Sequence, residues 1–187
     1  MLDWDGTVTV RDTLWMVLER FGDRAVFERA ENELVRGEIS YRELMELEMG
    51  TVRAPLDEVN SFLAEHARVR PGFRALAERW RPVILSSGFR ELIEPLLERE
   101  GVHVDVVANS IDPRADGWRV RWNDDAPCPE CGDLCKRRSA VVARLLDILN
   151  QLVEGNILVR VGVQGSGTDA LQKIEKAGFS RQINSQG

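Results

Sequence analysis

Two carboxylates one residue apart, Asp3 and Asp5, stand in the opening segment Met1-Leu2-Asp3-Trp4-Asp5-Gly6-Thr7-Val8-Thr9. Alternate side chains of a strand point to opposite faces, but the backbone can curl where a strand ends and bring both carboxylates to one opening. One of them could then attack a substrate while the other handles protons, as hydrolysis through a covalent intermediate requires. An acidic turn is an equally simple interpretation of the pair alone, so residues further along the chain must decide.

Two later segments offer groups that bind phosphate. A phosphate monoester resists an anionic nucleophile because its own oxygens are negative, so donors and positive charge must lie near the reacting group. Ser86, Ser87 and Gly88 close an apolar run just before a predicted helix, where hydroxyl and backbone donors can meet phosphate. Lys136 offers a compact positive charge for the phosphate. It is the first lysine of the sequence, since Lys136 is preceded only by arginines among these two residue types. Taken singly, the serines could be a helix cap and the lysine a solvated charge.

A helical block, residues 13–68, separates the first of these segments from the second. Asp12 predicts an N-cap for a helix over Thr13–Phe21, and apolar residues at three- and four-residue spacing continue the helical pattern to about Arg68. The block is divided into three or four helices by breaks at Gly22, Gly37 and Ala54-Pro55.

Strands alternate with helices after the boundary Arg70-Pro71-Gly72. The pattern first predicts a helix over 73–80, a strand over 82–89 that breaks at Gly88, and a helix over 90–99. A strand over 102–109 and a hairpin through the turn 112–117 into 118–122 follow. This alternation favours an α/β fold with a parallel sheet covered on both faces. The helical block then forms a lid over the strand ends, where sites of this architecture lie.

Composition limits the classes of function. The chain has 187 residues, 43% hydrophobic and 30% charged, with a net charge of −6, which predicts a soluble domain without a nucleic-acid-binding surface. No apolar run approaches the roughly 20 residues of a membrane span, and no signal peptide is recognisable. Three cysteines within eight residues fit a reducing compartment, so we expect a cytoplasmic protein without membrane contact.

In order and type, these segments resemble the motifs of the haloacid-dehalogenase-like phosphatases. Within that family the chain is most similar to the phosphoserine-phosphatase-like branch, subfamily IB, whose helical cap directly follows the first motif. The resemblance covers about residues 1–148: Asp3 to Thr9 match the first motif, Ser86 with Ser87-Gly88-Phe89 the second, and Cys135-Lys136-Arg137 the third. It implies a three-layer Rossmann-like parallel sheet with an inserted α-helical cap, residues 1–12 and 69–150 forming the core and 13–68 the cap.

The resemblance also implies a reaction and its residues. The chain would be a Mg²⁺-dependent phosphatase of a small phosphorylated metabolite, such as phosphoserine or a methionine-salvage enol phosphate. Asp3 would be the nucleophile that forms an aspartyl-phosphate. Asp5 would protonate the leaving oxygen and then accept a proton from the attacking water, and both aspartates would bind the magnesium ion. Phosphate would be bound by Thr7, which also orients its loop, and by Ser86, Ser87, Gly88 and Lys136. Asp12 stands where phosphoserine enzymes carry a substrate-facing glutamate, although an N-cap is an equally simple role.

The last part of the chain departs from the family pattern. In the family, a fourth motif, Gly-Asp-Gly with a further acid, follows a strand and completes the magnesium site. Here the strand-like segment 156–163 runs into Gln164-Gly165-Ser166-Gly167-Thr168-Asp169, where only Asp169 could serve as a magnesium ligand. Residues 1–150 contain no glutamine and residues 151–187 contain five, so we expect an atypical segment of different origin there. With little strand before Asp3, we expect a core truncated at both ends. The alternative function is a catalytically impaired or dead relative that only binds phosphorylated ligands.

The cysteines at positions 128, 131 and 135 favour a packed, reduced loop. Cys-Pro-x-Cys-Gly is typical of a zinc knuckle, but a closed structural zinc site needs four ligands. The two histidines, His66 and His103, lie in other predicted elements. A zinc-binding interaction module is therefore a third, more remote alternative.

Overall fold

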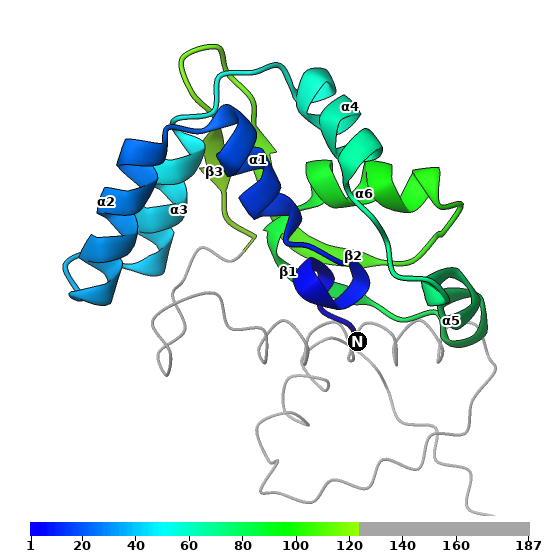
Figure 1. Cartoon of the computed structure of the whole chain (residues 1–187). Coiled ribbons are helices and arrows are strands. Elements are labelled where there is room, and N and C mark those ends of the chain that lie inside the picture. The colour runs from blue at the N-terminus through cyan, green and yellow to red at the C-terminus, as the bar shows by residue number, and fades with distance from the viewer. Residues whose placement is uncertain (124–187) are drawn as a thin grey trace, which may run out of the picture. The chain divides into compact units, whose positions relative to one another are not determined.

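The computed structural model describes residues 1–123, which all lie in the compact unit Met1–Ile148 (Figure 1). Lys136, the three cysteines, Asp169 and the segment 151–187 lie outside the described residues, so what the sequence predicts for them stays a prediction. No helix within residues 1–123 is long and apolar enough to cross a membrane.

The described sheet has the order β1-β2-β3. Strand β1 (Ile84–Phe89) runs parallel to β2 (Val106–Asp112), and β2 runs antiparallel to β3 (Arg119–Arg121). Leu2 adds a parallel bridge to Ile84, held by bonds from Leu2 N to Val83 O and from Leu85 N to Leu2 O. Parallel strands joined through a helix confirm the predicted α/β class, and the hairpin makes the sheet mixed.

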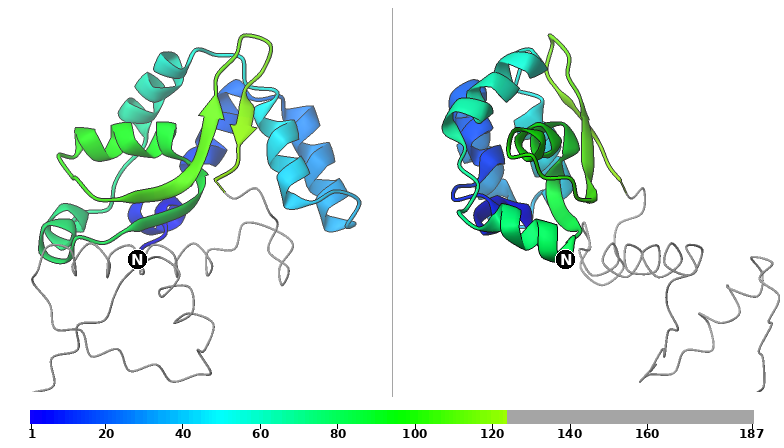
Figure 2. Two further views of the ribbon diagram at one scale, coloured as in Figure 1. Left: turned by 180° about the vertical axis from the view of Figure 1, so that it is seen from behind. Right: turned by 90° about the vertical axis from the view of Figure 1, so that its right-hand side faces the viewer.

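Helices α5 (Phe73–Trp80) and α6 (Arg90–Arg99) have the bounds that the sequence predicts. Helix α6 lies against β1 and β2 and buries Leu92, Ile93, Leu96 and Leu97 (Figure 2). The predicted start of the next strand at Val102 is wrong, because Gly101 at φ 64° still ends α6: its N–H donates to Glu98 O, and Val102 N donates to Leu97 O. The strand begins only at Val106.

The helical block consists of α1 (Thr13–Phe21), α2 (Arg24–Val35), α3 (Tyr41–Met49) and α4 (Leu56–His66). The carboxylate of Asp12 accepts a hydrogen bond from Trp15 N, which confirms the predicted N-cap of α1. A reciprocal capping box of Ser40 and Glu43 begins α3. The breaks at Gly22, Gly37 and Pro55 fall between the helices as predicted.

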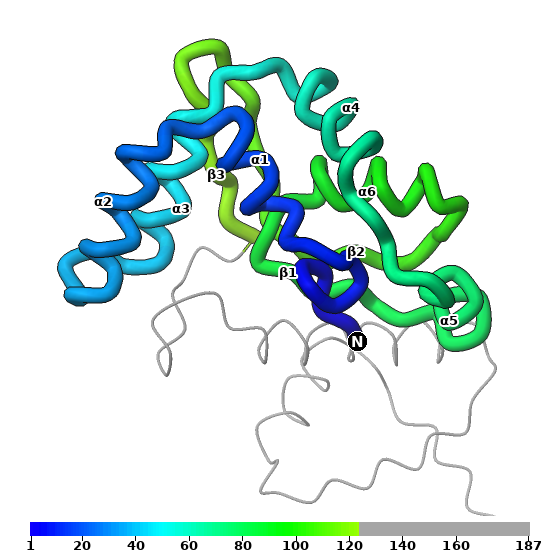
Figure 3. Tube along the Cα trace, in the orientation of Figure 1, coloured from blue at the N-terminus to red at the C-terminus, as the bar shows by residue number. Residues whose placement is uncertain are grey.

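The chain enters and leaves this block through two neighbouring segments. Thr9 forms an antiparallel bridge with Val69, flanked by bonds from Val10 N to Arg68 O and from Arg70 N to Val8 O, each 2.9 Å long. The tube in Figure 3 traces both segments beside the first turn of the chain. The two ends of the insertion are therefore paired with each other.

The turn between β2 and β3 contacts the insertion at the end of α3. Trp118 is 1% exposed; its backbone N–H donates to Met49 O and Val52 O, and its indole Nε1 donates to Ala54 O at 2.9 Å. Gly117 has φ 125°, and a Cβ on it would clash with the carbonyl oxygen of Gly50. Only glycine fits this approach of the two backbones.

Glu48 in α3 gives a first prediction, on stability. Its side chain is buried, and burial, with a smaller contribution from Glu31, raises its pKa from 4.5 to about 7. The stabilising contribution of the protonated group is complete below pH 4.5 and is lost as the pH rises through 7, because the folded protein must then ionise a buried carboxyl. We expect Glu48→Gln to reduce the loss of unfolding free energy between pH 5 and 8 by about 2 kcal/mol.

Urea unfolding of both proteins at the two pH values measures this difference. The exposed Glu58→Gln serves as the matched control and should leave the pH dependence of the wild type unchanged. An equal pH dependence in wild type and Glu48→Gln would show that Glu48 titrates alike in the folded and unfolded chain.

Candidate active site

The first motif forms a wide turn at the edge of the sheet. Directly after the bridge at Leu2, residues Trp4–Val8 curl, with Gly6 at φ 71°, a conformation that favours glycine. The hydroxyl of Thr9 closes the turn: it donates to Trp4 O and accepts from Gly6 N. The curl predicted at the end of the first strand is thus present.

The carboxyl of Asp5 lies beneath the start of α1. Its Oδ1 accepts two hydrogen bonds from Thr13, one from the backbone N–H at 2.7 Å and one from Oγ1 at 2.6 Å. Burial is the main cause that raises the pKa of Asp5 from 3.8 to about 6; the Thr13 bonds lower it, and the charges of Asp12 and Asp3 raise it. A carboxyl with this pKa can both donate and accept a proton near neutral pH.

The second motif is a bulge in β1. Leu85 pairs with Val107 and Phe89 with Asn109, so the three residues Ser86, Ser87 and Gly88 stand opposite a single residue of β2. Within the bulge, Gly88 N donates to Ser86 Oγ at 3.0 Å. Such bulges are common beside active sites, where they redirect backbone and side-chain groups. The sequence predicts a break at Gly88, whereas β1 continues to Phe89 with the irregularity inside it.

The two motifs meet. A Cβ placed on Gly88 would lie 3.6 Å from Asp5 Oδ2 and 3.2 Å from Ser86 Oγ. The parallel pairing of Leu2 with β1 brings Asp3, the next residue, to the same end of the strands. Asp3, Asp5 and the segment Ser86–Gly88 therefore lie at one edge of the sheet, as expected for a doubly wound fold.

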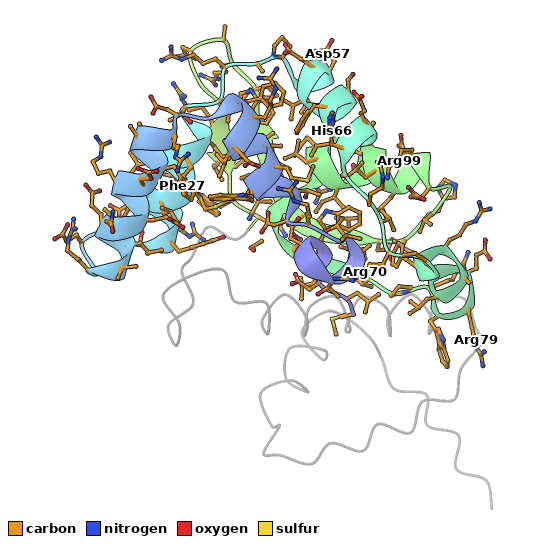
Figure 4. All side chains as sticks on the ribbon, in the orientation of Figure 1. Phe27, Asp57, His66, Arg70, Arg79 and Arg99 are labelled. Atoms are coloured by element: carbon orange, nitrogen blue, oxygen red, sulfur yellow. The ribbon has the colours of Figure 1, made fainter. Side chains whose placement is uncertain are left out.

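Within residues 1–123, the site is also supported by residues that the sequence did not predict as site residues: Thr9, Thr13, Arg70 and Asn109. Arg70 donates to Thr7 O at 3.0 Å and to Gly6 O at 2.9 Å, and Figure 4 shows its side chain beside this turn. Asn109 is 1% exposed, donates to Ser87 O at 2.8 Å and accepts from Asn123 N. Asn109 could have been found from the sequence, because a polar residue inside an apolar strand indicates a specific role. No comparable signal in the sequence marked Arg70.

Thr7 is exposed at this turn, and its carbonyl accepts from Arg70. In the described part of the chain, the hydrogen bonds that orient the turn come from Thr9 and Arg70. The loop-orienting and phosphate-binding roles of Thr7 both stay predictions. Asp3 and Asp5 offer carboxylate oxygens, the donors that Mg²⁺ prefers. Within residues 1–123, no three His, Cys, Asp or Glu residues form a group that could hold a metal ion. Two carboxylates with phosphate oxygens and water are nevertheless a common magnesium environment, so the pair fits the ion.

The model for the haloacid dehalogenase-like hydrolase family matches residues 1–150. Among curated proteins, the chain is 28% identical over 137 residues to Pdp3-interacting factor 1 of Schizosaccharomyces pombe, covering 66% of this chain and 59% of that protein. It is 27% identical over 154 residues to 2-hydroxy-3-keto-5-methylthiopentenyl-1-phosphate phosphatase of Bacillus cereus, covering 78% and 68%. The chain thus spans less than two thirds of the length of the Schizosaccharomyces pombe relative.

Solved structures resemble the chain in fold. A HAD family hydrolase from Salmonella enterica serovar Typhi superposes with a TM-score of 0.59 at 13% identity, over 79% of this chain and 50% of that one. Phosphoserine phosphatase, solved as an analogue of its phospho-aspartyl intermediate, superposes with a TM-score of 0.52 at 15% identity, over 83% and 71%. At these identities the likeness concerns the fold alone.

Proposed function

Since the chain belongs to the haloacid dehalogenase-like hydrolase family, we propose that it is a Mg²⁺-dependent phosphatase that hydrolyses a small phosphomonoester metabolite through an aspartyl-phosphate. The observation that carries the proposal is the meeting of Asp5 Oδ2 with the bulge at Ser86–Gly88. That meeting joins a group able to transfer protons to one able to bind an anion. The phosphatase name of the Bacillus cereus relative supports the same class of reaction.

The reaction has two balanced steps. In the first, a carboxylate oxygen of Asp3 bonds to phosphorus, the bond from phosphorus to the ester oxygen breaks, and that oxygen takes the proton of Asp5 and leaves as an alcohol. In the second, Asp5 as a carboxylate accepts a proton from water, whose oxygen bonds to phosphorus and breaks the bond to Asp3. Inorganic phosphate leaves, and both carboxyl groups return to their starting states.

Phosphate is held by the second motif. The Ser86 hydroxyl and the backbone of the bulge lie at the edge where Asp3 and Asp5 meet it, just before the N-terminus of α6 at Arg90. Backbone N–H groups and the helix dipole favour an anion at such a position. Lys136, outside the described residues, is proposed as the counter-charge.

Asp3 and Asp5 are the residues that would hold Mg²⁺, together with phosphate oxygens. When bound, the ion supplies positive charge that offsets the negative phosphoryl oxygens.

Hydrolysis of p-nitrophenyl phosphate by the purified full chain tests the proposal. We expect release of nitrophenol that requires added Mg²⁺ and stops with a chelator. Turnover at the rate without enzyme, in a sample shown to be folded by circular dichroism, would contradict a phosphatase. The alternative, a relative that binds without turning over, then predicts that inorganic phosphate still raises the melting temperature of the chain.

Gly88→Ala gives a prediction specific to this site. The added methyl group would lie 3.2 Å from Ser86 Oγ and 3.6 Å from Asp5 Oδ2, so it crowds the space between the two motifs. We expect kcat/KM for p-nitrophenyl phosphate to fall by about tenfold, because small displacements of catalytic groups are costly. The matched control is Ser61→Thr, which adds a methyl group at an exposed position of α4. A loss of the same size in the control would mean that the effect is not local to the site.

A further inference from the structure

We propose that Thr13 is a positioning residue that fixes the carboxyl of Asp5 with Oδ2, the oxygen that faces Gly88, turned toward the phosphate-binding bulge. This inference rests on the proposed function, in which Asp5 gives a proton to the leaving oxygen. It assigns the orientation of the acid to the first residue of the helical insertion, whereas Asp5 itself belongs to the turn at the edge of the sheet.

The direction of the Thr13 hydroxyl follows from its partners. The indole Nε1 of Trp4 lies 3.2 Å from Thr13 Oγ1, and an indole nitrogen can only donate. Thr13 Oγ1 must therefore accept from Trp4, and its own single proton is free for Asp5 Oδ1 at 2.6 Å. Trp4 and Thr13 are 0% and 2% exposed, so water does not compete for these bonds. The chain of donors runs one way, from Trp4 through Thr13 to Asp5.

The two oxygens of Asp5 consequently differ. Oδ1 accepts both the O–H and the backbone N–H of Thr13, so it is held under the start of α1. Oδ2 is therefore the oxygen left to exchange a proton with the substrate. That oxygen lies 3.6 Å from the position of a Gly88 Cβ, on the side of the phosphate-binding bulge.

Thr13 takes no part in the bond changes. As the ester oxygen leaves phosphorus, the bond between Asp5 Oδ2 and its proton breaks and a bond from that proton to the ester oxygen forms. Thr13 keeps its proton throughout and stabilises the carboxylate that remains. Without the hydroxyl, the carboxyl can rotate, and fewer molecules present the proton to the leaving oxygen.

Leaving-group dependence tests this role. A nitrophenolate leaves without much help from an acid, whereas an alkoxide needs a proton as the bond breaks. We expect Thr13→Val to lower kcat for an alkyl phosphate such as glycerol 2-phosphate by about 30-fold and kcat for p-nitrophenyl phosphate by less than about threefold, with KM nearly unchanged. Thr13→Ser keeps the hydroxyl and should recover most of the loss.

Thr51→Val is the matched control, because it removes a hydroxyl of the same insertion that donates to Glu48 O. It should change the two rates in equal proportion. If Thr13→Val also lowers both rates in equal proportion, Thr13 has only a structural role and the inference is overturned, while the phosphatase stands.

Wild-type protein that hydrolyses neither ester would contradict the proposed function instead. The contact can then be judged by hydrogen exchange of the Thr13 amide, measured by NMR in the wild type and in Asp5→Ala. Strong protection in the wild type that is lost in the variant supports the positioning contact. Equal exchange in the two proteins overturns it.

Discussion

Asp3→Asn is expected to lower kcat for p-nitrophenyl phosphate by at least about 1,000-fold, because an amide cannot act as the anionic nucleophile that forms an acyl phosphate. The substitution keeps the shape of the side chain, and Asp3 directly follows the pairing of Leu2 with β1. We therefore expect the circular dichroism spectrum and the melting temperature to stay close to those of the wild type. Steady-state kinetics at saturating Mg²⁺ measures the loss.

Asp23→Asn is the matched control for this substitution. Asp23 caps α2 by accepting from Ala25 N and Val26 N, a role that asparagine fills equally well. Its kcat should stay within about twofold of the wild type. A residual activity of Asp3→Asn within tenfold of the wild type would exclude Asp3 as the nucleophile and leave another group, or water, to attack phosphorus.

Trp118→Ala is expected to lower the free energy of unfolding by about 3–5 kcal/mol, a large part of the stability of a domain of this size. The indole is among the largest fully buried side chains, and its removal leaves a cavity and takes from Ala54 O its indole donor. Urea unfolding followed by circular dichroism measures the change.

Two variants separate the causes of that loss. Trp80 is 68% exposed, so Trp80→Ala should change the unfolding free energy by less than about 0.5 kcal/mol. Trp118→Phe keeps much of the buried ring but has no N–H for Ala54 O, and should lose about 1–3 kcal/mol. Equal effects of Trp118→Ala and Trp80→Ala would mean that the turn of the hairpin does not pack on the insertion.

The helices were predictable because their signals are local. Asp12 caps α1, and α5 and α6 begin and end where the sequence predicts. The start of β2 was not predictable from such local signals. The valines that follow Gly101 are as apolar as the residues of a strand, and the way in which α6 ends decides whether they pair. Periodicity alone does not separate a packed connection from a paired strand.

The site was predictable in its residue types and only partly in its geometry. Asp5 and the segment Ser86–Gly88 meet as the motifs imply. The bulge could not be foreseen, because it depends on the register of β1 against β2, which has no local signature. Thr13 was visible only as the first residue of a helix, since its bond to Asp5 depends on how α1 sits over the turn.

The pairing of Val8 and Val10 with Arg70 and Arg68 has a consequence for the order in which the protein can be made. The turn that carries both carboxylates is held by partners about sixty residues later in the chain, and by β1 later still. On the ribosome, where segments emerge in sequence order, residues 1–10 must wait for the whole insertion and then β1. Loop closure over that distance is slow. The two carboxylates therefore reach their final place only after the insertion and β1 have been made.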